Sequence, residues 1–142
     1  MNDFQSNTKK GSIAVESNED LTGKEGYLVK IVNSSGEKKA ALPSAAGDET
    51  PYFINDGAAS GNISELKPMR PDEQVRLRLN GTCDLWDVIV REDETGADKG
   101  KVRKLPASAG TYTRVGIAEE DGEDEQLLLI RPWRMGEKEV VV

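Results

Sequence analysis

The sequence predicts an all-β protein, built as a small β-barrel or a tulip-like β-sandwich of short antiparallel strands. Short runs of β-forming residues recur at intervals of about ten residues, and glycine, asparagine, aspartate and serine separate them. The run Glu73–Leu79 alternates between apolar and polar residues, which is the pattern of a half-buried strand. No run of about twelve residues shows the spacing of an amphipathic helix.

The first twenty residues lack this pattern and are predicted to form an extended N-terminal arm. Met1–Asp20 is rich in Asn, Ser, Lys and Glu, and such a composition does not support a packed core by itself. Its isolated apolar residues Phe4, Ile13 and Val15 are candidate anchors for a partner. The expected domain organisation is therefore an arm over residues 1–20 and a single β-barrel domain over residues 21–142.

In the first half of that domain, the strand-like runs are short. Tyr27–Val32 is a predicted strand, Asn33–Gly36 is a turn, and Lys38–Leu42 is expected to pair back as the second strand of a hairpin. Pro51–Ile54 is another predicted strand. The small residues of Gly57–Gly61 are too flexible for a strand interior.

The second half is more clearly patterned. Along Glu73–Leu79 the apolar residues face one way, and Arg76 and Arg78 face the other. Asn80-Gly81 is a strong hairpin signal and is expected to lead directly into a strand at Leu85–Val90.

Lys101–Leu105 is expected to continue the sheet. Thr111–Ala118 and Leu127–Arg131 form a predicted hairpin around the acidic loop Glu119–Glu125. We find no internal repeat in the sequence.

Composition narrows the function. The chain has 142 residues, a formal charge of −7 and a pI near 4.7, so duplex nucleic acid and anionic membranes are not expected partners, since phosphate binding needs clustered positive charge. No apolar stretch is long enough to span a bilayer. The single cysteine, Cys83, cannot form an intrachain disulfide and is expected to be buried.

The sequence contains few of the residue types and motifs that enzymes use for catalysis. There is no histidine, so a Ser–His or Cys–His nucleophile pair is impossible within one chain. One cysteine is too few for a cysteine-based zinc site, and no glycine-rich phosphate-binding motif occurs. We therefore expect no catalytic residues, no cofactor and no metal. The six carboxylates of Glu119–Glu125 leave calcium open as an alternative, although solvation of a charged hairpin tip is the favoured interpretation.

A few side chains are candidates for binding a partner. Arg76 and Arg78, with Arg131 and Arg134, either make cross-strand pairs with acidic residues or form a positive facet for an acidic partner. Trp86 is expected in the core, and Trp133 at an interface with a sister subunit.

Three segments, read in order, resemble a family of tailed-bacteriophage capsid decoration (cement) proteins: "NEDLTGKEGYLVKI", "RPDEQVRLRLNGTCDLWDVIV" and "GTYTRVGIAEEDGEDEQLLLIRPW". The resemblance covers about Asn18–Trp133. The charged insertion Arg91–Gly100 and the residues after Trp133 depart from the family pattern.

This resemblance implies a structural virion protein that is made in the host cytoplasm and binds the outer surface of an expanded capsid. The implied partners are the major capsid protein and sister copies in a homotrimer. The alternatives are another virion component (a head-fibre base, a tail subunit or an adaptor) and, from a different class, a carbohydrate-binding β-module. A hydrolase is the least expected, because histidine is absent.

Overall fold

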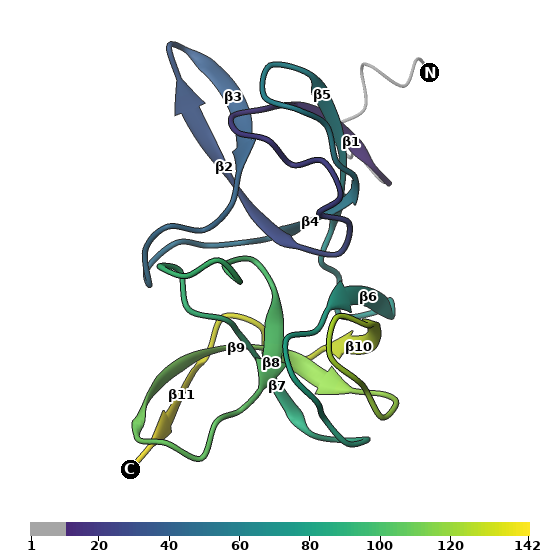
Figure 1. Ribbon diagram of the computed structural model, residues 1–142, viewed down its shortest axis with the longest axis vertical. Coiled ribbons are helices and arrows are strands. Elements are labelled where there is room, and N and C mark those ends of the chain that lie inside the picture. The colour runs from purple at the N-terminus through teal and green to yellow at the C-terminus, as the bar shows by residue number, and fades with distance from the viewer. Residues whose placement is uncertain (1–10) are drawn as a thin grey trace.

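The computed structural model describes residues 11–142, which form two β-lobes stacked along the long axis of the molecule (Figure 1). The all-β prediction is confirmed. We call the first lobe the N-terminal barrel; its strands are β1 (Ile13–Ser17), β2 (Leu28–Ser34), β3 (Glu37–Ala41), β4 (Tyr52–Asp56) and β5 (Ile63–Pro68). The second is the C-terminal lobe, with β6 (Val75–Arg78), β7 (Val88–Arg91), β8 (Val102–Lys104), β9 (Gly110–Ala118), β10 (Leu127–Pro132) and β11 (Lys138–Val141).

The N-terminal barrel is closed, with the strand order β1-β3-β2-β4-β5. Strand β1 pairs antiparallel with β5 on one side and parallel with β3 on the other, at Glu16 and Ser17. The prediction of an arm is therefore wrong over Ile13–Ser17, which forms a strand of the barrel. Its β-branched Ile13 and Val15 supply one apolar face of a strand, a signal too short to stand out among polar neighbours.

The C-terminal lobe has the order β6-β10-β9-β7-β8, and β11 adds to the first half of β9. An isolated parallel bridge joins Leu79, just after β6, to Val102 of β8. The two edge strands of this sheet therefore meet, and the sheet curls around its own core.

The two lobes have the same connectivity, which corrects the expectation that the chain holds no repeat. In each lobe the first strand lies parallel to the third: the Asn18 amide donates to the Ala40 carbonyl at 2.8 Å, and the Asn80 amide donates to the Val102 carbonyl at 2.8 Å. The segments after the third strands also match, as LPSAAG from Leu42 and LPASAG from Leu105.

Hydrogen bonds align the rest of the two lobes. The Gly26 amide donates to Ile54 and the Trp86 amide to Ala118; the Met69 amide donates to Pro51 and the Trp133 amide to Val115. These bonds make four pairs of equivalent positions: Gly26 and Trp86, Leu28 and Val88, Phe53 and Ile117, Met69 and Trp133.

Each lobe has its own apolar core. The core of the N-terminal barrel contains Leu21, Tyr27, Val29, Ala40, Leu42, Ile54 and Leu66. The core of the C-terminal lobe contains Val75, Leu77, Leu79, Cys83, Ile89, Val102, Val115, Ala118, Leu128 and Ile130, and it also takes in Leu28 and Phe53 from the N-terminal barrel. The two cores are therefore coupled through side chains of β2 and β4.

Most predicted strands are confirmed, including the β2–β3 and β9–β10 hairpins. The hairpin predicted at Asn80-Gly81 is wrong, because β6 pairs with β10 and β7 pairs with β8 and β9. Asn80 instead donates its backbone N–H to Val102, and Gly81 donates its own to the Asp124 carboxylate at 2.7 Å. Long-range pairing outweighed the local turn signal.

Candidate interaction surface

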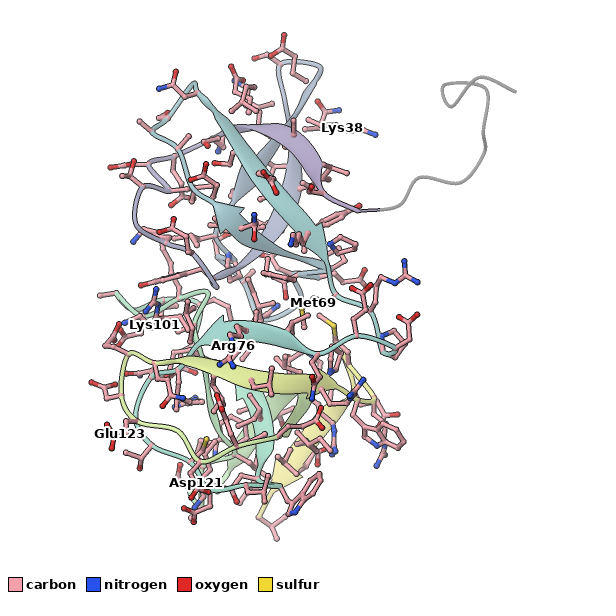
Figure 2. All side chains as sticks on the ribbon, turned by 90° about the vertical axis from the view of Figure 1, so that its right-hand side faces the viewer. Lys38, Met69, Arg76, Lys101, Asp121 and Glu123 are labelled. Atoms are coloured by element: carbon pink, nitrogen blue, oxygen red, sulfur yellow. The ribbon has the colours of Figure 1, made fainter. Side chains whose placement is uncertain are left out.

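The junction between the lobes shows how one such barrel docks on another. Leu28 is fully buried there and Phe53 is 8% exposed. The Leu28 amide donates to the Gly100 carbonyl at 2.7 Å, and the Arg78 amide donates to the Gly26 carbonyl at 2.9 Å. Figure 2 shows Met69 and Arg76 near this junction.

Gly26 allows the close approach of the two lobes. A Cβ placed on this residue would contact the Leu127 side chain and lie 2.9 Å from the Arg78 nitrogen. Its φ of +83° also belongs to the region that favours glycine. A side chain at this position is therefore incompatible with the junction as built.

The equivalent face of the C-terminal lobe is uncovered. We call it the Trp face; it consists of Trp86, Val88, Ile117 and Trp133. Val88 of β7 pairs with Ile117 of β9, and Ile117 pairs in turn with Arg131 of β10, so Val88, Ile117 and Arg131 form one row across three strands. The two tryptophans lie just outside the strands, Trp86 before β7 and Trp133 after β10. Trp86 is 64% exposed and Trp133 is 53% exposed. Two solvent-exposed indole rings next to half-buried aliphatic residues are typical of a protein-binding surface.

The core position predicted for Trp86 is wrong. Trp86 lies in the turn before β7 with a φ of +74°, because the backbone changes direction here as it does at Gly26 in the first lobe. The turn directs the chain into β7 while the indole stays outside. Trp133 follows β10 and is exposed in the single chain, where an interface residue would be available to a sister subunit.

The predicted arginines are brought together on β6, but each is engaged within the chain. Arg76 forms an ion pair with Glu120 at 3.0 Å, and Arg78 donates to the Glu125 carbonyl at 2.7 Å. Arg131 forms an ion pair with Glu119, and Arg134 forms one with Glu137. Arg76 and Arg131 fit the predicted pairing with acidic residues. Arg78 instead binds backbone carbonyls, and Arg134 pairs with a residue of its own turn. The positive docking facet stays a prediction.

The acidic loop is held by its own carboxylates. Glu120 accepts hydrogen bonds from the Leu129 amide at 3.0 Å and from Arg76, and these contacts lower the pKa of its carboxyl below the ordinary value. Asp121 accepts from the Leu85 amide at 2.8 Å, and Asp124 accepts from Gly81. Within residues 11–142 no group of three or more acidic, cysteine or histidine side chains is arranged to hold a metal ion.

The remaining predicted residues that the structure describes fall outside any free surface. Ile13 and Val15 pack against the core of the N-terminal barrel, so they are not free anchors. Phe4 lies outside the described residues. Cys83 is 5% exposed, and burial raises the pKa of its thiol. No helix within residues 11–142 is long and apolar enough to cross a bilayer.

The sequence did not lead us to predict that the four residues of the Trp face form one surface. Val88 and Ile117 looked like ordinary strand residues, and the sequence does not say which face of a two-sided strand is covered. The available signal was the repeat itself: Val88 and Ile117 align with Leu28 and Phe53, and within residues 11–142 no further barrel covers them.

Comparison with known proteins supports the fold. The chain shares its fold with the head fiber gp8.5 N base of bacteriophage phi29, with a TM-score of 0.65 and 15% sequence identity. The match covers 90% of this chain and 98% of that chain. No protein-family model and no curated protein sequence matches the chain.

Proposed function

We propose that this chain is a structural protein of a tailed-phage virion and that it attaches to the outer surface of the capsid. The observation that carries the proposal is the two-lobed architecture, which is shared almost end to end with a phage head-fibre base. The absence of histidine and the exposed Trp face agree with a role in binding and not in chemistry. The proposed partner is the major capsid protein, and sister copies complete a homotrimer.

In this proposal the protein acts as a cement. A protein that binds the expanded lattice but not its precursor stabilises the expanded form by its binding free energy, multiplied over many sites. Trimers strengthen attachment through avidity, without new kinds of contact. Residues 1–10, including Phe4, are proposed to extend the contact by strand addition to a capsid edge.

The second candidate is a head-fibre base, and the shared fold favours it specifically. A base anchors a fibre and has no need to stabilise the shell. The two roles make different predictions for the capsid, although both place the protein on its outer surface.

Mixing purified protein with expanded, undecorated capsids tests the proposal. We expect saturable binding with a fixed number of copies, counted by gel densitometry and seen by microscopy as knobs on the heads. A cement raises the temperature at which the capsids rupture, and a fibre base leaves it unchanged. Lack of binding to capsids, together with recovery of the protein on tails or on glycans, would overturn the proposal.

A further inference from the structure

We propose that the open edge of strand β11 binds the same edge of a second copy of this chain, so that the two β11 strands pair antiparallel across a two-fold axis. The contact joins the C-terminal lobes of two molecules into one continuous sheet. The inference rests on the backbone of β11 and on the exposure of its side chains, and it does not depend on the capsid being the partner.

Strand β11 has a partner on one side only. It pairs antiparallel with the first half of β9, and Figure 1 shows it beside β9 at the end of the C-terminal lobe that lies away from the N-terminal barrel. Within residues 11–142 every other strand has a hydrogen-bonded neighbour on both sides, because the N-terminal barrel is closed and Leu79 joins Val102 across the C-terminal lobe. The outer side of β11 is therefore the open edge of the described fold.

The pairing with β9 fixes which backbone groups of β11 point outward. The Arg114 amide donates to the carbonyl just before β11 at 2.8 Å, so Arg114 faces β11. Backbone groups alternate in direction along a strand, so Tyr112 also faces β11, and its partner Glu139 faces β9. The N–H and C=O groups of Lys138 and Val140 therefore point away from β9, where a further strand can bind them.

The side chains along this edge do not protect it from another strand. Val140 is 67% exposed. Both charged side chains of β11 are bound to β9: Glu139 accepts a hydrogen bond from Arg114 at 2.8 Å, and Lys138 donates one to the Thr113 hydroxyl at 2.7 Å. Edge strands that remain single commonly carry free charges, proline or a bulge. An exposed apolar edge without these features is typical of a site of strand addition.

A second β11 strand fits this edge best in one register. Outward-facing residues must lie opposite each other, so the possible registers differ by steps of two residues. With Val140 opposite its own equivalent, Lys138 lies opposite Val142. Glu139 then lies opposite Val141, so no like charges meet and the two exposed Val140 side chains pack together.

The neighbouring registers are less favourable. Slipping the partner toward the start of β11 places Glu139 opposite Glu139, and a further step places Lys138 opposite Lys138, both of which oppose like charges. Slipping it the other way leaves Lys138 and Glu139 without a cross-strand neighbour.

A second copy is the occupant that these observations favour, because the edge is its own complement in this register. The contact is isologous and closes with two copies. It is therefore separate from the threefold clustering in the proposed function, and it would form in addition to that clustering.

Sedimentation velocity over a concentration series tests the association without any capsid. Val140→Asp places two carboxylates opposite each other. Val140→Pro keeps an apolar side chain but removes an N–H that the partner strand needs and that β9 does not use. Ile63→Asp is the matched control, because Ile63 is an apolar strand residue of β5 that is 62% exposed. Far-UV circular dichroism verifies that each variant is folded.

We expect the wild type and the control to associate as the concentration rises, and both Val140 variants to lose this step. Each substitution acts twice in a two-fold contact, so the association should weaken by about tenfold or more.

Cysteine cross-linking tests the register. In the proposed pairing the two residues at position 140 have Cα atoms about 5.5 Å apart, which is within the range of a disulfide. Val140→Cys should therefore give a disulfide-linked dimer on a non-reducing gel after mild oxidation. Lys138→Cys should give none, because its two copies lie on opposite sides of the axis. The wild type controls for Cys83, which is only 5% exposed.

Four results would overturn the proposal. These are a wild type that does not associate up to its solubility limit, Val140 variants that associate as strongly as the wild type, an Ile63→Asp control that loses the association equally, and cross-linking of Lys138→Cys that matches that of Val140→Cys. Capsid binding, measured separately on the Val140 variants, reports on the proposed function and leaves this test unaffected.

Discussion

The coupling between the two lobes can be measured at Leu28. This side chain belongs to the N-terminal barrel, is fully buried, and lies in the core of the C-terminal lobe. Leu28→Ala removes apolar volume from the junction but leaves the hydrogen bond from the residue 28 amide to Gly100 in place.

The expected cost follows from the buried hydrocarbon. Removing three carbons at about 0.8 kcal/mol each costs about 2.4 kcal/mol, and the residual cavity adds about 1 kcal/mol. The free energy of unfolding should therefore fall by about 3 kcal/mol. For a chain of this size the melting temperature should fall by about 10 °C.

Val88→Ala is the matched control, because Val88 holds the equivalent position in the C-terminal lobe but is only half-buried. It should cost about 1 kcal/mol or less. Both variants are compared by urea unfolding, followed by far-UV circular dichroism at a concentration where the protein is monomeric. If Leu28→Ala costs no more than Val88→Ala, Leu28 does not pack into the second core and the coupling argument fails.

Three further predictions follow from single contacts. Gly122→Ala should lower the free energy of unfolding by about 1–3 kcal/mol, because a Cβ there would lie 2.7 Å from both Leu128 and Leu79; unchanged urea unfolding would show that this site is not tightly packed. Asp48 accepts hydrogen bonds from Lys30 at 2.7 Å and from the amides of Ser44 and Ala45, which together lower its pKa from 3.8 to about 2. The ionised Asp48 should stabilise the fold by about 1 kcal/mol after solvent screening. This stabilisation is complete above pH 3.8 and is lost as the pH falls through about 2, so the difference in stability between wild type and Asp48→Asn should disappear over that window. A difference that stays constant in acid unfolding would contradict this. Cys83 should react with a disulfide reagent only as fast as the protein opens, because its thiol is buried and its pKa is raised; the rapid reaction of a free thiol in the folded protein would place it at the surface.

The local patterns in the sequence were sufficient for much of the β-structure. Residues 75–79 alternate, and the structure buries Val75, Leu77 and Leu79 while Arg76 is exposed. The β9–β10 hairpin was also predictable, because its strands are long and its acidic loop is too polar to be buried. In both cases the signal lies between residues close in sequence, within reach of the strand period.

Strand β1 could not be predicted in this way. Ile13–Ser17 is stabilised by pairing with β5, about fifty residues away, and by the parallel contact with β3. Its apolar residues Ile13 and Val15 form too short a pattern to stand out among polar neighbours, so only its partners make it a strand. The same reasoning explains Asn80-Gly81, where a sequence typical of a hairpin serves a turn whose next strand pairs elsewhere.

The sequence by itself determined the strand period, the turns and the lack of histidine chemistry, because each is a property of neighbouring residues or of composition. Only the tertiary structure decided that the chain folds as two equivalent barrels and that Trp86 stands outside while Leu28 is buried. Burial depends on what lies opposite a face, and the equivalent faces of the two lobes meet different surroundings. The first is covered by the second barrel, and the second is covered by nothing within residues 11–142.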